Sequence, residues 1–332
     1  MNTGFEYYSQ GCTPKRPTPI AHPEAILPKY QPDVVRDIVQ IINTARRPVD
    51  CSSLEGEIQS NLTRTVGAFV QRGFPVEFML LGFPCKSPNR VTKVIGVEPD
   101  KAEEVAIEQL ARFCRRVNTV YPNGAVFNIA SDGQIFSEVF GVPDEVVHQY
   151  VFRLQEMILQ KKAPIEVFRL QDFFPESRLC EVREHFMQDY SPSRQDMDAK
   201  IREDEASKRI YMGFKWFIEE EFPPNHGLSR SALQKQAAEK AMEAMIRNEA
   251  YGRLIAEQFP GVVRFSIHSH HSPSKYGIKN LMTGCNLKGT PWHCAIAQTR
   301  DGNSIPIRRH EAEARGYKLI HVAGRPYYFT ET

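Results

Sequence analysis

The sequence has no strong charge of either sign, because 42 lysines and arginines nearly balance 40 aspartates and glutamates and leave a formal net charge of +2. Proteins that bind nucleic acids or anionic membranes through their overall field carry a much larger positive excess. The composition, with 41% hydrophobic and 25% charged residues, is that of an ordinary globular protein. We therefore expect small-molecule substrates, and neither nucleic acid nor a membrane, as partners.

Long apolar runs and closely spaced cysteines are also missing. No stretch approaches the about 20 apolar residues that cross a bilayer, and the first residues, MNTGFEYYSQ, lack the basic and then apolar pattern of a signal peptide. The seven cysteines are odd in number and scattered, which argues against a disulfide framework. These absences predict a soluble cytoplasmic protein with reduced thiols.

Proline is concentrated at the beginning of the chain, where the first 32 residues contain six prolines: Pro14, Pro17, Pro19, Pro23, Pro28 and Pro32. Proline lacks the amide hydrogen and fixes φ, so this segment favours an extended conformation over a paired strand or a helix. We expect an extended arm over residues 1–30, followed by a single α/β catalytic domain over residues 31–332.

Within that domain, short apolar runs alternate with amphipathic segments. The runs 76–81 and 125–130 are typical of strands buried on both faces. Helical periodicity follows each run, beginning at Asp100, which has a capping-box partner in Glu103, and near Pro143. Alternation of this kind predicts an α/β fold with a Rossmann-like, mostly parallel sheet and helices on both faces.

The second half of the chain departs from this alternation. Residues 172–228 contain charged, helix-like segments without a strand, which indicates a helical insertion, and a long helix follows from about Ser231 to Gln258. Near the C-terminus, Asp301 and Gly302 separate two strand-like runs, which is a hairpin signal, and residues 318–329 predict a further antiparallel strand pair at the edge of the sheet.

Polar residues gather directly after the two buried strands. Four of them follow the first strand: Lys86, Ser87, Asn89 and Lys93. Asp132 follows the second strand, beside Gly133. In open α/β sheets, ligands bind at the carboxyl ends of the strands. Lysines supply charge for a phosphate or carboxylate, and serine and asparagine supply directed hydrogen bonds. A solvated basic loop and a turn aspartate are the alternatives for these two clusters.

A third polar set lies on one face of the segment GVVRFSIHSH, residues 261–270. Because strand side chains alternate with period two, Arg264, Ser266, His268 and His270 point to the same side. His268 and His270, with His293, also have the residue types of a three-ligand zinc site, although no helical His-Glu-Xaa-Xaa-His element is present. Acid/base residues and metal ligands are thus two alternatives, and we expect no metal.

Five segments together resemble the pyoverdine/dityrosine biosynthesis family, whose members include isocyanide (isonitrile) synthases. They are GFPCKSPNRVTKVIGVEPD at 82–100, SDGQIF at 131–136, GVPDEVVHQY at 141–150, RFSIHSHH at 264–271 and GTPWH at 289–293. The resemblance covers most of residues 70–330 and is weak between 170 and 225. It implies an enzyme that converts the amino group of tyrosine or tryptophan into an isocyanide, with tyrosine preferred.

In such a reaction, the carbon comes from the ketone of ribulose 5-phosphate, which is a co-substrate, and no cofactor is needed. The resemblance also implies an iron/2-oxoglutarate oxygenase as a pathway partner. Two alternatives are a formyl-type modification of the tyrosine amine, as in dityrosine formation, and a protein that binds a phosphorylated ligand without turnover.

The resemblance assigns expected roles to the polar residues. The phosphate would be held by Lys86, Ser87, Asn89 and Lys93. Proton transfer would use His268, His270, Asp132 and His293. Arg264 would clamp the amino-acid carboxylate, with a structural ion pair as its alternative. Trp292 would border the aromatic pocket, with a place in the core as its alternative.

Overall fold

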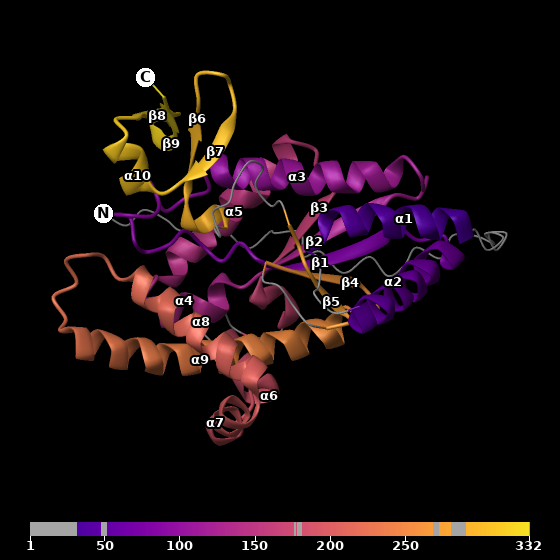
Figure 1. Cartoon of the computed structure of the whole chain (residues 1–332), viewed down its shortest axis with the longest axis horizontal. Coiled ribbons are helices and arrows are strands. Elements are labelled where there is room, and N and C mark those ends of the chain that lie inside the picture. The colour runs from indigo at the N-terminus through magenta and orange to yellow at the C-terminus, as the bar shows by residue number, and fades with distance from the viewer. Residues whose placement is uncertain are drawn as a thin grey trace, which may run out of the picture.

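A five-stranded, entirely parallel sheet forms the centre of the fold in the computed structural model (Figure 1). The structure describes residues 32–47, 52–175, 177, 181–267, 272–279 and 290–331, so the predicted N-terminal arm lies outside the described residues. The strands are β1 (Val76–Gly82), β2 (Ala125–Ser131), β3 (Ile165–Phe168), β4 (Val263–Ser266) and β5 (Lys275–Gly277). Their order, β3-β2-β1-β4-β5, confirms the predicted Rossmann-like sheet.

Helices cover both faces of this sheet, as Figure 1 shows. One face packs against α1 (Pro32–Ala45), α2 (Ser52–Arg72), α3 (Lys101–Asn118) and α5 (Asp144–Gln160). The other face packs against α4 (Gly133–Phe140) and α9 (Arg230–Gln258). Among the helices of the described chain, none combines the length and the apolar composition needed to cross a membrane.

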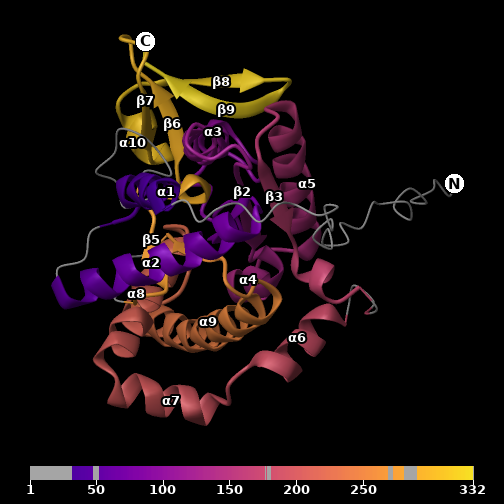
Figure 2. The same ribbon diagram turned by 90° about the vertical axis from the view of Figure 1, so that its right-hand side faces the viewer.

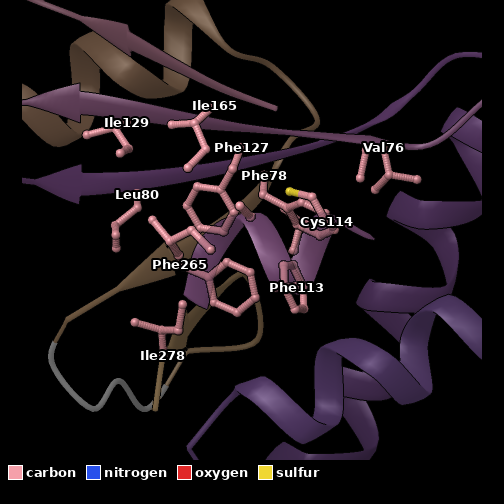
Figure 3. Close-up of a cluster of buried hydrophobic side chains, with 14 of the residues drawn as sticks. Val76, Phe78, Leu80, Phe113, Cys114, Phe127, Ile129, Ile165, Phe265 and Ile278 are labelled. Carbon is pink, nitrogen blue, oxygen red and sulfur yellow. The ribbon is translucent and has the colours of Figure 1, made fainter. Parts of the chain in front are cut away.

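The core on the α3 face is built around aromatic rings from neighbouring strands (Figure 3). Phe78 of β1 and Phe127 of β2 lie with ring centroids 5.9 Å apart, and Phe127 lies 6.0 Å from Phe265 of β4. Phe113 of α3 meets Phe78 edge to face at 4.8 Å. The parallel register places these strand residues side by side, so β1 is fixed between β2 and β4. The predicted strand over 76–81 is thus the central strand of the sheet.

The predicted insertion is helical and forms an outer layer against α9 (Figure 2). It comprises a short 3-10 turn (Leu170–Phe173), α6 (Val182–Tyr190), α7 (Arg194–Glu203) and α8 (Glu205–Glu221). Met197 of α7 packs against Met242 and Met245 of α9. Helix α9 begins at Arg230, slightly before the predicted start, because the side chain of Ser229 accepts the capping hydrogen bond from Ala232 N.

The C-terminal hairpins are confirmed, but the last strand pair does not lie at the edge of the main sheet. Strands β6 (Ala295–Gln298), β7 (Ser304–Ile307), β8 (Lys318–Val322) and β9 (Arg325–Thr330) form a second sheet of order β7-β6-β9-β8, with α10 (Arg309–Ala314) beside it. Parallel pairing of β6 with β9 joins the two hairpins. This sheet packs on α3, where Cys294 and Ile296 contact Ala102.

One glycine brings the loops after β1 and β2 into contact. A Cβ atom at Gly133 would lie 2.1 Å from the carbonyl oxygen of Pro84 and 2.6 Å from Cγ1 of Val147. The carbonyl belongs to the backbone of the loop after β1, so it has little freedom to move away. The close approach therefore requires glycine at position 133.

We expect Gly133→Ala to lower the free energy of unfolding by about 1 to 3 kcal/mol, because the added methyl group overpacks the contact between the two loops. Gly213→Ala in α8 is the matched control, since a Cβ there meets no atom within 4 Å. In that control, the free energy of unfolding should rise by about 0.5 to 1 kcal/mol, because alanine has a higher helix propensity than glycine. Urea denaturation measures both, and a Gly133→Ala protein as stable as the wild type would contradict the close approach.

Candidate active site

The candidate site lies where the connections of the sheet change direction. From β1 the chain moves outward to β2 and β3, whereas β4 and β5 lie on the other side of β1. In open parallel sheets, the carboxyl ends of the strands at such a point form the ligand-binding crevice. The loop 83–93 follows β1, Asp132 follows β2, and Ser266 ends β4. Three of the predicted polar clusters thus adjoin the same edge.

Lys86 is enclosed in an ion cluster between the loop after β1 and the start of α3. It is 3% exposed, and its Nζ lies 2.8 Å from Asp100 Oδ2 and 2.7 Å from Glu103 Oε2. It also donates to the carbonyl oxygen of Pro291 at 3.1 Å. An ammonium has three hydrogens, and three acceptors of the same chain surround this one. In this arrangement, Lys86 has a structural role and offers no donor to a phosphate.

The pKa values of this cluster reflect burial and mutual attraction. Burial acts to lower the pKa of Lys86, but Asp100 and Glu103 outweigh it and raise that pKa above its usual value. Burial raises the pKa of Asp100 to about 7, with Lys86 opposing the change. Tyr150 of α5 donates to Glu103 Oε1 at 3.0 Å. The cluster therefore joins the loop after β1 to both α3 and α5.

The other predicted phosphate ligands contact the end of the helical insertion. Lys93 Nζ lies 2.6 Å from Glu221 Oε1, and the Ser87 hydroxyl donates to Glu221 Oε2. Asn89 Nδ2 donates to the carbonyl oxygen of Glu220 at 3.0 Å. Glu221 is the last residue of α8 and is buried. The loop after β1 thus holds the insertion in place, and the charge of Lys93 is balanced within the protein.

His293 borders this contact, whereas Trp292 belongs to the core. His293 Nε2 lies 3.8 Å from Glu221 Oε1, and its Nδ1 is 2.6 Å from the hydroxyl of Thr290. Trp292 is 3% exposed, and its ring packs over Gly82 and lies 5.0 Å from the ring of Phe83. The packing alternative considered for Trp292 therefore describes its position.

Asp132 is the predicted residue whose environment is best suited to proton transfer. Its Oδ1 atom is buried without a hydrogen-bond partner in the described part of the chain. Burial raises the pKa of its carboxyl to about 7. The neighbouring Cys85 thiol is different, because burial, with smaller contributions from Asp132 and Glu221, raises its pKa to about 12. Asp132 can therefore exchange a proton near neutral pH, whereas Cys85 stays a neutral thiol.

Arg264 lies on the α9 face of the sheet with few partners. Its Nη2 approaches the carbonyl oxygen of Gly252 in α9 at 3.5 Å, and its Nε is buried without a hydrogen-bond partner among the described residues. The register pairs Arg264 with Lys275 of β5. The structural ion pair considered as an alternative for Arg264 is not formed with any described carboxylate.

Two predicted catalytic residues, His268 and His270, lie outside the described residues. Their assignment as acid/base groups stays a prediction. Within the described ranges, no group of three His, Cys, Asp or Glu side chains comes close enough to hold a metal ion. A metal site that includes His268 and His270 therefore stays an alternative.

Sequence reasoning missed two charged residues near the site. Glu221 ends the run Glu219–Glu221, which is typical of a solvated helix face, and only the tertiary contact with the loop after β1 buries it. Lys275 begins a strand of three residues, too short to show a period of two. The opposite charge of Lys93 was a weak signal for Glu221, but nothing local marked Lys275.

We expect Lys86→Met to destabilise the protein by about 3 to 5 kcal/mol, because it leaves two buried carboxylates without their cation. Lys235→Met on the exposed side of α9 is the control and should change stability by less than about 0.5 kcal/mol. Urea denaturation at pH 7.5 compares the two variants. Equal stability of Lys86→Met and the wild type would refute the structural role of Lys86.

Comparison with known proteins places the chain in a family. Residues 66–320 match the family described as pyoverdine/dityrosine biosynthesis protein. An L-tyrosine isonitrile synthase from Xenorhabdus nematophila is 33% identical over 275 residues, or 80% of this chain and 81% of the relative. An L-tryptophan isonitrile synthase from Fischerella ambigua is 32% identical over 268 residues, covering 80% of each chain. The crystal structure of the PvcA protein from Pseudomonas aeruginosa matches with a TM-score of 0.85 and 28% identity, covering 90% of this chain and 100% of that one. The chain therefore belongs to the pyoverdine/dityrosine biosynthesis protein family.

Proposed function

We propose that this protein is a cytoplasmic isonitrile synthase that converts the amino group of L-tyrosine, or of L-tryptophan, into an isocyanide. The observation that carries the proposal is its similarity, over about four fifths of both chains, to isonitrile synthases that are named for these two amino acids. The position of Asp132 at the carboxyl edge of the sheet, with a pKa of about 7, supports it, because the reaction depends on proton transfer.

Ribulose 5-phosphate is the proposed carbon donor. The amine nitrogen bonds to the ketone carbon, and water leaves to give an imine. Removal of a proton next to that carbon prepares the loss of phosphate, and cleavage of the adjacent carbon–carbon bonds releases the remaining sugar carbons as separate fragments and leaves the donor carbon on nitrogen. Substrates supply the nucleophile, the electrophile and the leaving group, so the protein contributes positioning and proton transfer.

Asp132 is the proposed base for the proton removed next to the ketone carbon. Its carboxylate is the reactive form, and the buried Oδ1, which has no hydrogen-bond partner among the residues that the structure describes, can accept that proton. His293, next to Glu221, is the proposed second proton-transfer group, and His268 and His270 remain in this role as predicted from the sequence. We further propose that an iron/2-oxoglutarate oxygenase consumes the product.

The family's description also includes dityrosine biosynthesis, which favours one alternative, a formyl-type modification of the tyrosine amine. A mass-spectrometric assay with L-tyrosine or L-tryptophan and ribulose 5-phosphate separates the candidates. An isocyanide product, formed also after exhaustive treatment with a chelator, is the expected result. Formylated amine without isocyanide would favour the alternative reaction. If no new carbon appears on the nitrogen, the remaining candidate is a binding protein without turnover. If the chelator abolishes activity and one divalent ion restores it, the protein has a metal site.

Asp132→Asn tests the role of the carboxylate. Because a base must be ionised and burial raises this pKa to about 7, kcat/KM of the wild type should rise with pH through about 7. The variant should lose about a hundredfold or more in kcat/KM, together with that pH dependence. Asp198→Asn, on the exposed side of α7, should retain both. An Asp132→Asn enzyme with an unchanged pH profile would exclude Asp132 as the base.

A further inference from the structure

Arg264 and Lys275 lie side by side on one face of the sheet. They are partners in the parallel register of β4 and β5, and Arg264 is also the partner of Met79 in β1. Val263 and Phe265 point into the core on the α3 face, so the side chains of Arg264 and its partner Lys275 point to the opposite face, which α9 covers. Both cations are half-buried there, within reach of solvent.

No carboxylate of the described residues balances either charge. Burial lowers the pKa of Arg264, and burial, followed by repulsion from Arg264, lowers the pKa of Lys275 to about 8. The four cations that are fully buried in the described part of the chain differ in this respect, because each forms an ion pair with one or more carboxylates. They are Arg46 with Glu55, Lys86 with Asp100 and Glu103, Lys93 with Glu221, and Arg247 with Glu138 and Glu243.

Two adjacent, uncompensated cations repel each other and are unfavourable to bury. Such an arrangement costs stability in the empty protein, and an anion that binds between the two charges removes that cost. A carboxylate carries one negative charge, whereas a phosphate monoester carries about −1.5 to −2 at neutral pH. Arginine offers a planar fork of donors and lysine a compact charge, a combination that suits phosphate oxygens.

The pair is linked to the candidate catalytic carboxylate through one turn of α9. The Tyr251 hydroxyl donates to the carbonyl oxygen of Ser131, the residue before Asp132, at 3.2 Å. The next residue, Gly252, presents its carbonyl oxygen to Arg264. A ligand anchored at Arg264 therefore lies on the same side of the sheet as Tyr251, whose hydroxyl contacts the end of β2.

We propose that Arg264 and Lys275 form the phosphate-binding site of this protein. The inference rests on the proposed function in one respect, namely that the phosphate belongs to the sugar phosphate that donates the carbon. It reassigns the phosphate from the loop after β1, whose lysines are paired internally, to the β4–β5 pair. It also gives Arg264 a phosphate ligand in place of the amino-acid carboxylate expected from the sequence.

Calorimetric titration of the full chain tests the proposal with three probes: inorganic phosphate, ribulose 5-phosphate and L-tyrosine. Lys275→Met and Arg264→Met should each weaken binding of both phosphate probes at least tenfold and change the affinity for tyrosine less than twofold. Lys235→Met, on the exposed side of α9, should bind all three probes like the wild type. Loss of tyrosine affinity with intact phosphate affinity would assign the pair to a carboxylate, and unchanged affinities would exclude the pair as an anion site.

Thermal unfolding gives a second readout that does not depend on turnover. Without ligand, Lys275→Met should raise the melting temperature, because it removes the repulsion with Arg264. Phosphate should raise the melting temperature of the wild type by mass action and have little effect on the variant. A Lys275→Met protein with a lower melting temperature and a normal response to phosphate would overturn the proposal. Phosphate binding at the pair in a protein that makes no isocyanide would contradict the proposed function alone.

Discussion

The buried ion cluster around Lys86 is the interaction on which the rest of the site depends. Charged groups without access to water are tolerated only if opposite charges and hydrogen bonds compensate them, and here the ammonium of Lys86 meets the two carboxylates of Asp100 and Glu103 and the carbonyl oxygen of Pro291. The cluster fixes the loop after β1 against α3 and the segment that leads to the second sheet. Because this loop also holds the end of the insertion through Glu221, several distant segments take their positions from it.

The two parts of the candidate site differ in whether their charged side chains are paired within the protein. In the loop after β1, the lysines are neutralised by carboxylates of the same chain, so the loop is held firmly and contributes shape. On the α9 face, Arg264 and Lys275 have no such partners among the described residues, and within the same ranges Asp132 keeps a buried oxygen without a hydrogen bond. Groups left unsatisfied at some cost in stability are those that a bound substrate can satisfy, which is why the proposed chemistry is placed between Asp132 and the cation pair.

The sequence predicted best what local chemistry determines. Buried runs gave β1 and β2, and the capping box of Asp100 and Glu103 forms as expected. The short elements β3, β5 and α4 were missed, since none is long enough to show a period, and the longer helix α2 (Ser52–Arg72) was not predicted either. The sequence could not show whether a lysine of this loop binds a ligand or pairs with a carboxylate of the same chain. The carboxylate that pairs with Lys93, for example, lies 128 residues away. A basic loop that contacts carboxylates and one that binds phosphate have the same local sequence.

The most direct test of this account is a crystal structure of the protein with ribulose 5-phosphate bound. The account predicts that the phosphate lies on the α9 face, with its oxygens at about 2.7 to 2.9 Å from the guanidinium of Arg264 and Nζ of Lys275, while Lys86 keeps its contacts to Asp100 and Glu103. A phosphate seated in the loop after β1, with Lys86 or Lys93 turned away from its carboxylates and toward the ligand, would contradict it.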